Sequence, residues 1–354
     1  HHLIIMNNIS NRLKYNSKLV MTETSKYISS WLIITMIMVV LMIVIGGITR
    51  LTESGLSMVE WRPLYGFLPP MNNIEWERIF TLYMNSPEYI IKNNGMDLSE
   101  FKSIFFWEYF HRLWGRLIGI IFIIPLIFFF ILKIFPQFLF KRILIVLFLG
   151  GLQGIIGWWM VKSGLVNDPS VSQYRLATHL SNAFLILFLL MWTFLDLKEG
   201  SVKMKLDFNF FVLIILSITI IAGAFVAGMD AGLMYNEYPL MGEGFVPENY
   251  GEYNFLDPFE NPASAQFHHR HLGLFTMITI LFFGFKNFTA TNDSRMRKII
   301  LLMGITVFFQ FLLGIVTLIN MVPIHLGALH QTGAVILFLI VTAGIHRKYL
   351  LKKS

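Results

Sequence analysis

Eight runs of about 20 predominantly apolar residues alternate with polar segments along the chain. The runs occupy residues 30–49, 104–132, 142–161, 174–195, 209–229, 263–285, 299–319 and 325–345. A helix rises about 1.5 Å per residue, so about 20 residues cross the hydrocarbon core of a bilayer. The pattern therefore predicts an all-α integral membrane protein with eight transmembrane helices.

The second half of the sequence repeats the first at matched places within these runs. The repeated residues are Gly46, Glu53, Gly55, Leu56, Pro70, His111, Arg112, Gly115, Gln153, Gly157, Ala177, His179 and Ala183, which recur in the same order as Gly223, Asp230, Gly232, Leu233, Pro247, His269, Arg270, Gly273, Gln310, Gly314, Ala328, His330 and Ala334. Each half contains four apolar runs. The repeat therefore predicts two tandem, pseudo-symmetric four-helix bundles.

Lysine and arginine set the expected orientation. They concentrate in the N-terminal segment, in the last residues and in every second loop between them. By the positive-inside rule, both termini are cytoplasmic, or face the matrix in an organelle. We expect a cytoplasmic segment at residues 1–29, an N-terminal bundle at 30–196, an inner linker at 197–208, a C-terminal bundle at 209–346 and a cytoplasmic tail at 347–354.

Composition narrows the chemistry. The 354 residues are 55% hydrophobic and 14% charged, with a mean hydropathy of +0.63. The formal charge of +7 is explained by orientation in the lipid bilayer, so we expect no nucleic-acid partner. Because the chain has no cysteine, disulfides, thiolate metal sites, iron–sulfur ligation and cysteine nucleophiles are excluded. A metal or cofactor must be held by other side chains.

Each half has one repeated histidine in its second run and one in its fourth: His111 with His179, and His269 with His330. All four lie near the outer ends of their runs, at similar depth. Two histidines at one depth on two helices can ligate a haem iron from opposite sides, so the sequence predicts two haem sites with these four residues as axial ligands. Zinc is disfavoured because it takes four compact ligands.

The two halves differ beside the histidines. Glu108 lies three residues before His111, whereas the corresponding residue before His269 is the neutral Gln266. An ionisable group at one site only predicts chemistry in the first half and electron transfer or structure in the second.

Three arginines inside the spans, Arg112, Arg116 and Arg270, suit haem propionates or Glu108. The alternative is that they extend outward to water. Four other histidines are less suited to be ligands. Helical spacing turns His268 and His271 away from His269, and surface roles are expected for His325 and His346 at the ends of spans. Gly46-Gly47 and Gly150-Gly151 predict close helix contacts.

With these residues in place, the chain resembles the haem A synthase family. The resemblance rests on Thr49 to Ser57, Val59-Glu60-Trp61, Pro69-Pro70, Glu108 to Arg112, Gln153 to Trp158, Gln173 to His179, Gly228 to Leu233, Pro262 to Arg270, and Ala328 to Gln331. It covers about residues 30 to 345. The absence of a cysteine pair from the first outer loop is similar to the proteobacterial and mitochondrial branch.

The resemblance implies oxidation of the C8 methyl group of haem O to a formyl group, in two steps through an alcohol and a hydrate, giving haem A for terminal oxidases. It implies that His269 and His330 hold a permanent haem B. It also implies that His111 and His179 hold the substrate haem beside an essential Glu108. A plausible role of Glu108 is to take a proton from the methyl carbon or to stabilise positive charge on it.

The same resemblance implies a haem O synthase as supplier of the substrate, an electron donor for which a ferredoxin-type protein is one candidate, and cytochrome oxidase assembly factors; a homo-oligomer is compatible with it. Residues 1 to 28 lack the apolar core of a signal peptide and the Arg/Ser-rich character of a transit peptide. This favours a bacterial plasma membrane, with a mitochondrial inner membrane as the alternative.

Two other functions compete. A non-catalytic dihaem b-type electron carrier usually places its haems near opposite membrane faces, whereas all four histidines here are expected near one face. A haem transporter or chaperone needs only labile binding and no Glu108. The three functions differ in what they require of the first histidine pair.

Overall fold

The computed structural model describes residues 2–60, 67–165 and 169–352, with side chains from residue 24 onward. Eight helices in these segments are long and apolar enough to cross a membrane. They are α1 (His2–Leu51), α4 (Leu98–Ile131), α5 (Phe140–Gly164), α6 (Gln173–Glu199), α7 (Phe208–Gly228), α9 (Pro262–Thr289), α10 (Ser294–Ile319) and α11 (Ile324–Leu351). The prediction of an all-α protein with eight spans is confirmed.

Most of the helices are longer than the apolar runs, because polar residues continue them. The largest extension is at α1, which begins at His2 and not at 30. Helix α4 begins at Leu98, six residues before the predicted start at 104, and Asp97 caps it in a reciprocal capping box with Glu100. The loops contain further short elements that hydropathy did not predict. These are α2 (Asn73–Met84), α3 (Pro87–Ile91), η1 (Gln137–Leu139), η2 (Ala231–Leu233), η3 (Asn254–Leu256) and α8 (Asp257–Glu260).

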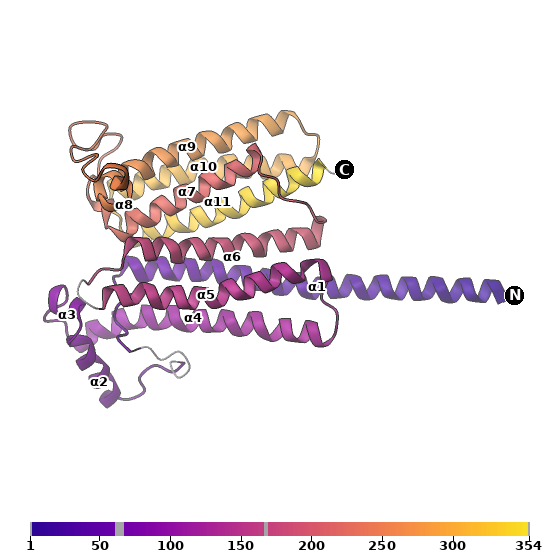
Figure 1. Ribbon diagram of the computed structural model, residues 1–354, viewed down its shortest axis with the longest axis horizontal. Coiled ribbons are helices and arrows are strands. Elements are labelled where there is room, and N and C mark those ends of the chain that lie inside the picture. Colours follow the sequence, from indigo (N-terminus) through magenta and orange to yellow (C-terminus); the bar gives the residue numbers. More distant parts are fainter. Residues whose placement is uncertain (1, 61–66, 166–168, 353–354) are drawn as a thin grey trace.

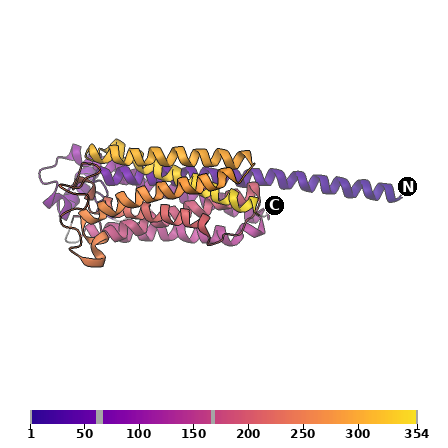
Figure 2. The same cartoon turned by 90° about the horizontal axis from the view of Figure 1, so that it is seen from above.

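Figure 1 shows the spans lying side by side, with α2, α3 and α8 gathered at one end and both chain termini at the other. We call these the loop-bearing end and the terminal end. Helices α1, α4, α5 and α6 of the first half pack together, as do α7, α9, α10 and α11 of the second. The halves meet where α1 and α6 contact α11 and where α6 contacts α7, and the view from above in Figure 2 shows the same parallel packing.

A proline inside α4 illustrates how the spans are joined. Pro125 has no N–H, so the carbonyl of Ile121 one turn earlier lacks its helical donor. The indole Nε1 of Trp31 on α1 donates to that carbonyl at 3.1 Å. A neighbouring helix thus satisfies the freed backbone group, as hydrocarbon requires.

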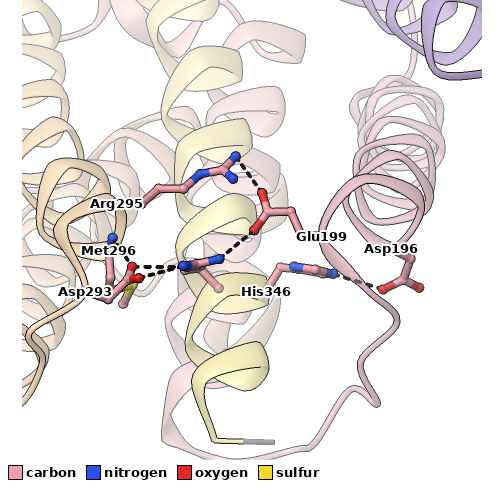
Figure 3. Close-up of polar contacts among 7 residues, drawn as sticks. Asp196, Glu199, Asp293, Arg295, Met296 and His346 are labelled. Atoms are coloured by element: carbon pink, nitrogen blue, oxygen red, sulfur yellow. Dashed lines mark hydrogen bonds and ion pairs between the residues drawn. The ribbon is translucent and has the colours of Figure 1, made fainter. Parts of the chain in front are cut away.

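The main apolar core has members on all eight spans, and it includes Trp31, Leu187, Trp192, Phe283 and Phe338. An ionic cluster of α6, α10 and α11 lies at the terminal end. Figure 3 shows Glu199 of α6 contacting Arg295 of α10, and Asp196 contacting His346 of α11. The expectation of a surface role for His346 is wrong, since its side chain is fully buried and bonds Asp196 at 2.9 Å.

A few residues of the sequence motifs and predicted segments fall outside the described part of the chain: Trp61 of the first-loop motif, His1 of the N-terminal segment, and residues 353–354 of the tail. The assignment of 30–196 and 209–346 as separate functional bundles stays a prediction. The described helices nevertheless place the repeated residues at equivalent positions. Glu53 and Asp230, for example, both follow the end of a span with a left-handed backbone, at φ 50° and 52°.

Candidate functional site

The four repeated histidines all lie on helices that run away from the loop-bearing end. His179, His269 and His330 are in the second turn of α6, α9 and α11. His111 lies about two turns further along α4, because that helix begins earlier. The sequence-derived expectation that each half offers a histidine from its second and fourth spans therefore matches the observed helices.

The second histidine pair, His269 and His330, has a separation suited to a metal between the rings. Their ring centroids are 6.4 Å apart and the ring planes are at 89°. Two metal–imidazole bonds of about 2.0 Å, with each nitrogen about 1.1 Å from its ring centre, span about 6 Å. The pair therefore fits a single iron held from both sides.

One ring of this pair is fixed in orientation. Nδ1 of His269 lies 3.1 Å from the carbonyl oxygen of Thr219 on α7. A ring N–H that donates to a backbone carbonyl leaves the other nitrogen, Nε2, free to bind metal, and this is the usual outer support of a ligating histidine.

The first histidine pair, His111 and His179, is supported differently. The two imidazoles are near enough to interact electrostatically. Within the described residues, Nδ1 of each ring is buried and has no hydrogen-bond partner. Buried polar atoms are almost always paired, so two unpaired imidazole nitrogens in facing helices indicate a place for a ligand. These two rings therefore have less hydrogen-bond support at Nδ1 than His269 has.

A glycine lies against each of the four rings. An added Cβ would approach the ring atom Cε1 to 3.1 Å at Gly46 for His111 and at Gly157 for His179. The corresponding distance is 2.9 Å at Gly223 for His269 and at Gly314 for His330. These four positions are two of the four glycine pairs that the sequence repeat matches, Gly46 with Gly223 and Gly157 with Gly314. Each histidine ring thus lies close against a position without a side chain, and an added Cβ would require the ring to shift.

A glutamine repeats beside the fourth span of each half. Nε2 of Gln153 on α5 donates to the carbonyl of His179 at 3.1 Å, and Nε2 of Gln310 on α10 donates to the carbonyl of His330 at 2.7 Å. Gln310 also lies 3.2 Å from the Nδ1 of His330. These amides tie the third helix of each half to the histidine-bearing turn of the fourth.

Glu108 is buried, with 3% of its surface exposed, and its carboxylate faces the first loop. Oε2 accepts hydrogen bonds from the hydroxyl of Ser57 at 2.8 Å and from the N–H of Met58 at 2.6 Å. Oε1 pairs with Arg112, one turn further along α4. Arg112 also donates to the carbonyl of Met58 at 3.2 Å. Of the two roles expected for Arg112, pairing with Glu108 is the one observed.

The second half repeats this arrangement with the charge removed. Nε2 of Gln266 donates to the carbonyl of Tyr235 at 3.0 Å, and its Oε1 accepts from Arg270 at 3.1 Å. Arg270 donates to the same carbonyl of Tyr235 at 2.9 Å. Tyr235 lies three residues after Gly232, as Met58 lies three residues after Gly55, so both sites use the same loop position.

The remaining predicted residues are placed as follows. The guanidinium of Arg116 lies over the ring of Phe67, at 5.4 Å from its centroid. His268 contacts the hydroxyl of Tyr250 at 3.1 Å, and Nδ1 of His271 lies 2.8 Å from the carbonyl of Phe267. His325 is exposed at the start of α11. His268 and His271 therefore have contacts other than those of the second histidine pair.

Two glycine pairs were expected to make close helix contacts. Gly46 and Gly47 do so, whereas nothing lies within 4 Å of a Cβ built at Gly150 or Gly151, so that part of the expectation is wrong.

Sequence reasoning also missed Ser57 and Met58 as partners of Glu108. The repeat already matched Gly46, Gly157 and Gln153 to second-half residues, but gave no reason to place them against histidines.

A buried carboxyl group also lies near the first site in the loop-bearing end. Glu88 of α3 is 3% exposed and accepts from the hydroxyl of Tyr83 at 2.9 Å, which in turn accepts from Asn93 at 2.7 Å. Burial raises the pKa of Glu88 to about 7, against the opposing effect of the Tyr83 hydrogen bond, and the charge of Glu108 raises it further.

The loop before α9 is held by a different acid. Burial disfavours the charged form of Asp257, but hydrogen bonds from Ser264 and from the N–H groups of Tyr253 and Gly251 outweigh it and lower the pKa of Asp257. Asp257 thus stays charged and ties the loop to the first turn of α9, which carries His269 a turn and a half later.

The histidines of the candidate site come in pairs. In the described segments, no group of three or more His, Asp or Glu residues is placed to hold a metal ion. Zinc in proteins takes at least three protein ligands. Paired histidines from facing helices, with glycines beside the rings, instead suit a flat macrocycle with iron at its centre.

Comparison with known proteins agrees with this geometry. The sequence profile of the cytochrome oxidase assembly protein family matches residues 29–342. A haem A synthase of Granulibacter bethesdensis is 42% identical over 327 residues, covering 90% of this chain and 86% of the relative. The chain belongs to the haem A synthase family.

Other haem A synthases are similar in extent. That of Nitrosospira multiformis is 41% identical over 326 residues, covering 88% of this chain and 91% of the relative. That of Rickettsia bellii is 41% identical over 327 residues, covering 89% and 96%. The family match spans all eight transmembrane helices, so the haem A synthase relationship applies to both histidine pairs and not to one half alone.

Proposed function

We propose that the chain is a haem A synthase that oxidises the C8 methyl group of haem O to a formyl group. Family membership supports this reaction. The structural observation that carries the proposal is the difference between two otherwise equivalent sites. The first half has a buried carboxylate, Glu108, one turn from its histidine, and the second half has the neutral Gln266 in the same place.

The first histidine pair is the substrate site in this proposal. A substrate has to enter and leave, which suits rings whose Nδ1 atoms have no protein partner among the described residues. The methyl carbon has to lose hydrogen in each oxidation, and a carboxylate beside it can take that hydrogen as a proton. Glu108 is the carboxylate nearest along the helix to His111, and three hydrogen-bond donors hold it in one orientation.

Glu108 has two ways to assist. It can accept a proton from the methyl carbon, or its charge can stabilise positive charge that develops there. Ser57, Met58 and Arg112 fix the position of the carboxylate and keep water from solvating it freely. In a site of low dielectric such a fixed charge acts more strongly than in water.

The second histidine pair holds a resident haem B in this proposal. Haem B supplies one-electron redox chemistry when bound. The hydrogen bond between His269 and Thr219 fixes one ring, and Gln266 keeps the surroundings free of a negative carboxylate. A fixed ring suits a cofactor that stays bound better than a substrate that is exchanged.

The arginines have separate roles in the proposal. Arg112 positions Glu108. Arg116 lies five residues after His111 on α4, and Arg270 directly follows His269 on α9, where a guanidinium can pair with haem propionates. The Nε of Arg270 is buried and has no partner among the described residues, which leaves a donor for such a group.

The chain is a multi-pass membrane protein. We assign its loop-bearing end to the outer face of a bacterial plasma membrane, with both termini cytoplasmic. Support comes from Lys and Arg, which are abundant at the terminal end. A haem O synthase as supplier and a ferredoxin-type protein as electron donor belong to the same proposal.

The decisive experiment is extraction and mass analysis of the haems from purified wild-type protein and from Glu108→Gln. The wild type is expected to contain haem B together with haem O or haem A. Glu108→Gln is expected to keep both haems but to lose oxidation by about 100-fold or more. Glu77→Gln, which removes an exposed carboxylate of α2, is the matched control and should oxidise haem O normally.

Two results would contradict the proposal. Full turnover in Glu108→Gln with both haems bound removes the role of the carboxylate. Two unmodified haem B molecules in the wild type, even when haem O is supplied, would instead indicate a dihaem electron carrier.

A further inference from the structure

Two neighbouring glycines of α1 contact both histidine-bearing regions. Gly46 lies against the ring of His111 in the first half. Gly47 lies against the side chain of Gln331, which directly follows His330 in the second half. Successive residues of a helix point about 100° apart, so adjacent residues can face two different helices. One turn of α1 therefore touches a ligand turn of each half.

The contact with Gln331 is close and polar. A Cβ at Gly47 would lie only 1.9 Å from Oε1 of Gln331, so no other residue fits without moving this side chain. Nε2 of Gln331 donates to the carbonyl of Ile43 at 2.9 Å, across the contact between α11 and α1. A polar side chain within a membrane span must find such a partner, and this one finds it in the other half of the chain.

The repeat provides a comparison within the same molecule. The residue after Gly223 is Ala224, and the residue after His179 is Leu180. Ala224 belongs to a small apolar cluster against which Leu180 packs. The equivalent crossing between α6 and α7 is thus made by alanine and leucine, without an amide. Simple helix packing does not require a glycine and a glutamine at this position.

We propose that Gln331 and Gly47 are positioning residues that couple the two histidine pairs. Gln331 fixes the His330 turn of α11 to the same turn of α1 that seats His111. Binding of a haem at the first histidine pair therefore alters the geometry of the second pair. The link is Gly46-Gly47, because Gly46 lies against His111 and Gly47 lies against Gln331. This inference rests on the proposed function, because it takes both histidine pairs to be haem sites.

The test replaces the residue pair at the α1–α11 contact with the pair found at the equivalent α6–α7 contact. The double variant Gly47→Ala/Gln331→Leu copies the Ala224–Leu180 pair, which the fold already accommodates. Gln331→Leu alone, with Gly47 retained, avoids any clash if the double variant folds poorly. Leu180→Met, a change of similar volume at the other crossing, is the control.

Each protein is examined for haem content, for the midpoint potential of each haem and for the low-spin electron paramagnetic resonance signals, before and after addition of haem O. These signals depend on the relative orientation of the axial imidazole planes, which a purely structural contact would leave unchanged. In the wild type and in Leu180→Met, haem O is expected to shift the signal of the second-half haem. In the double variant and in Gln331→Leu, we expect two bound haems, an altered potential of the second-half haem, and no shift on addition of haem O.

An unchanged potential and the same haem O-dependent shift in the double variant would overturn the inference, as would a wild-type signal that ignores haem O. The proposed synthase activity is tested separately from the coupling, by whether haem O is oxidised. A wild type that binds two haems and shows the shift, but returns haem O unoxidised, refutes the synthase activity and leaves the coupling standing. A wild type that binds no haem refutes both.

Discussion

Gln266 occupies in the second half the place that Glu108 occupies in the first, and its hydrogen bond to the loop runs in the opposite direction. Glu108 accepts from the N–H of Met58 at 2.6 Å, whereas Gln266 donates to the carbonyl of Tyr235 at 3.0 Å. The exchange of a carboxylate for an amide is therefore matched by the exchange of a backbone donor for a backbone acceptor. Each loop is arranged for the residue it meets.

Gln266→Glu should harm the second site, because it places a carboxylate against the carbonyl of Tyr235. The carbonyl keeps its hydrogen bond from Arg270, but the carboxylate oxygen that replaces Nε2 faces it without a donor, and the expected cost is about 1–3 kcal/mol. Haem content should fall selectively in the second half, measured by the absorption spectrum and by haem extraction. Retention of both haems with an unchanged spectrum would show that the loop carbonyl does not discriminate between the two side chains.

Alanine at the ring-facing glycines should empty the sites one at a time. Gly223→Ala places a Cβ 2.9 Å from Cε1 of His269, and Gly157→Ala places one 3.1 Å from Cε1 of His179. Overpacking of this kind costs about 1–3 kcal/mol and displaces the ring. We expect Gly223→Ala to lose the second-half haem and Gly157→Ala the first-half haem.

The matched control for these glycines is Gly119→Ala on α4, where nothing lies within 4 Å of the added Cβ. It should bind haem as the wild type does. Equal haem loss in all three variants would mean that alanine disturbs the helices in general and that ring seating is not the cause.

The loop-bearing end should loosen as the pH rises from about 4.5 to 7. The pKa of Glu88 is raised from 4.5 to about 7, so the folded state keeps a proton that the unfolded state releases in this window. The stabilisation that comes from protonated Glu88 is fully present below pH 4.5, declines between pH 4.5 and about 7, and is absent above that. The total change in the free energy of unfolding is at most about 3 kcal/mol. Hydrogen exchange of α2 and α3 at pH 5 and pH 8 measures it.

Glu88→Gln tests the cause, because an amide cannot ionise. After correction for the intrinsic pH dependence of amide exchange, the variant should show equal protection factors at both pH values and be more protected than the wild type at pH 8. The charged and titratable groups that act on Glu88 are Tyr83, Lys92, Glu53 and Glu108. A slope that persists in Glu88→Gln would assign the pH dependence to one of these groups.

Removal of the Asp196 carboxylate should destabilise the terminal end without affecting the haems. Asp196 bonds His346 at 2.9 Å and Arg142 at 2.8 Å, and its side chain is fully buried. Asp196→Ala leaves both partners without a carboxylate, which typically costs about 3–5 kcal/mol. Thermal unfolding followed by tryptophan fluorescence should show the loss, with the haem spectrum unchanged before unfolding.

Arg295→Ala is the control for this cluster (Figure 3). Arg295 is 58% exposed and its partner Glu199 retains Arg347, so the expected cost is below about 1 kcal/mol. Similar destabilisation by both variants would contradict the distinction between a buried and an exposed ion pair.

Much of this architecture could be predicted from the chain alone, because hydrocarbon imposes a simple rule. Spans of about 20 apolar residues had to be helices, and the structure contains all eight among its described residues. The internal repeat likewise marked His111, His179, His269 and His330 as equivalent. The short helices α2 and α3 were not predicted, since their formation depends on local caps such as Asn72 and Ser86 and on packing around Tyr83.

The sequence by itself determined the number of spans, the four repeated histidines and the difference between Glu108 and Gln266, because each depends on residue type and spacing. Only the tertiary structure decided what these residues touch. It brought Ser57 and Met58 of the loop to Glu108, and it buried His346 against Asp196 from another helix. It also placed Gln331 on Gly47, nearly 300 positions away along the chain. Such contacts join segments that no periodicity connects, and they form only when the helices pack.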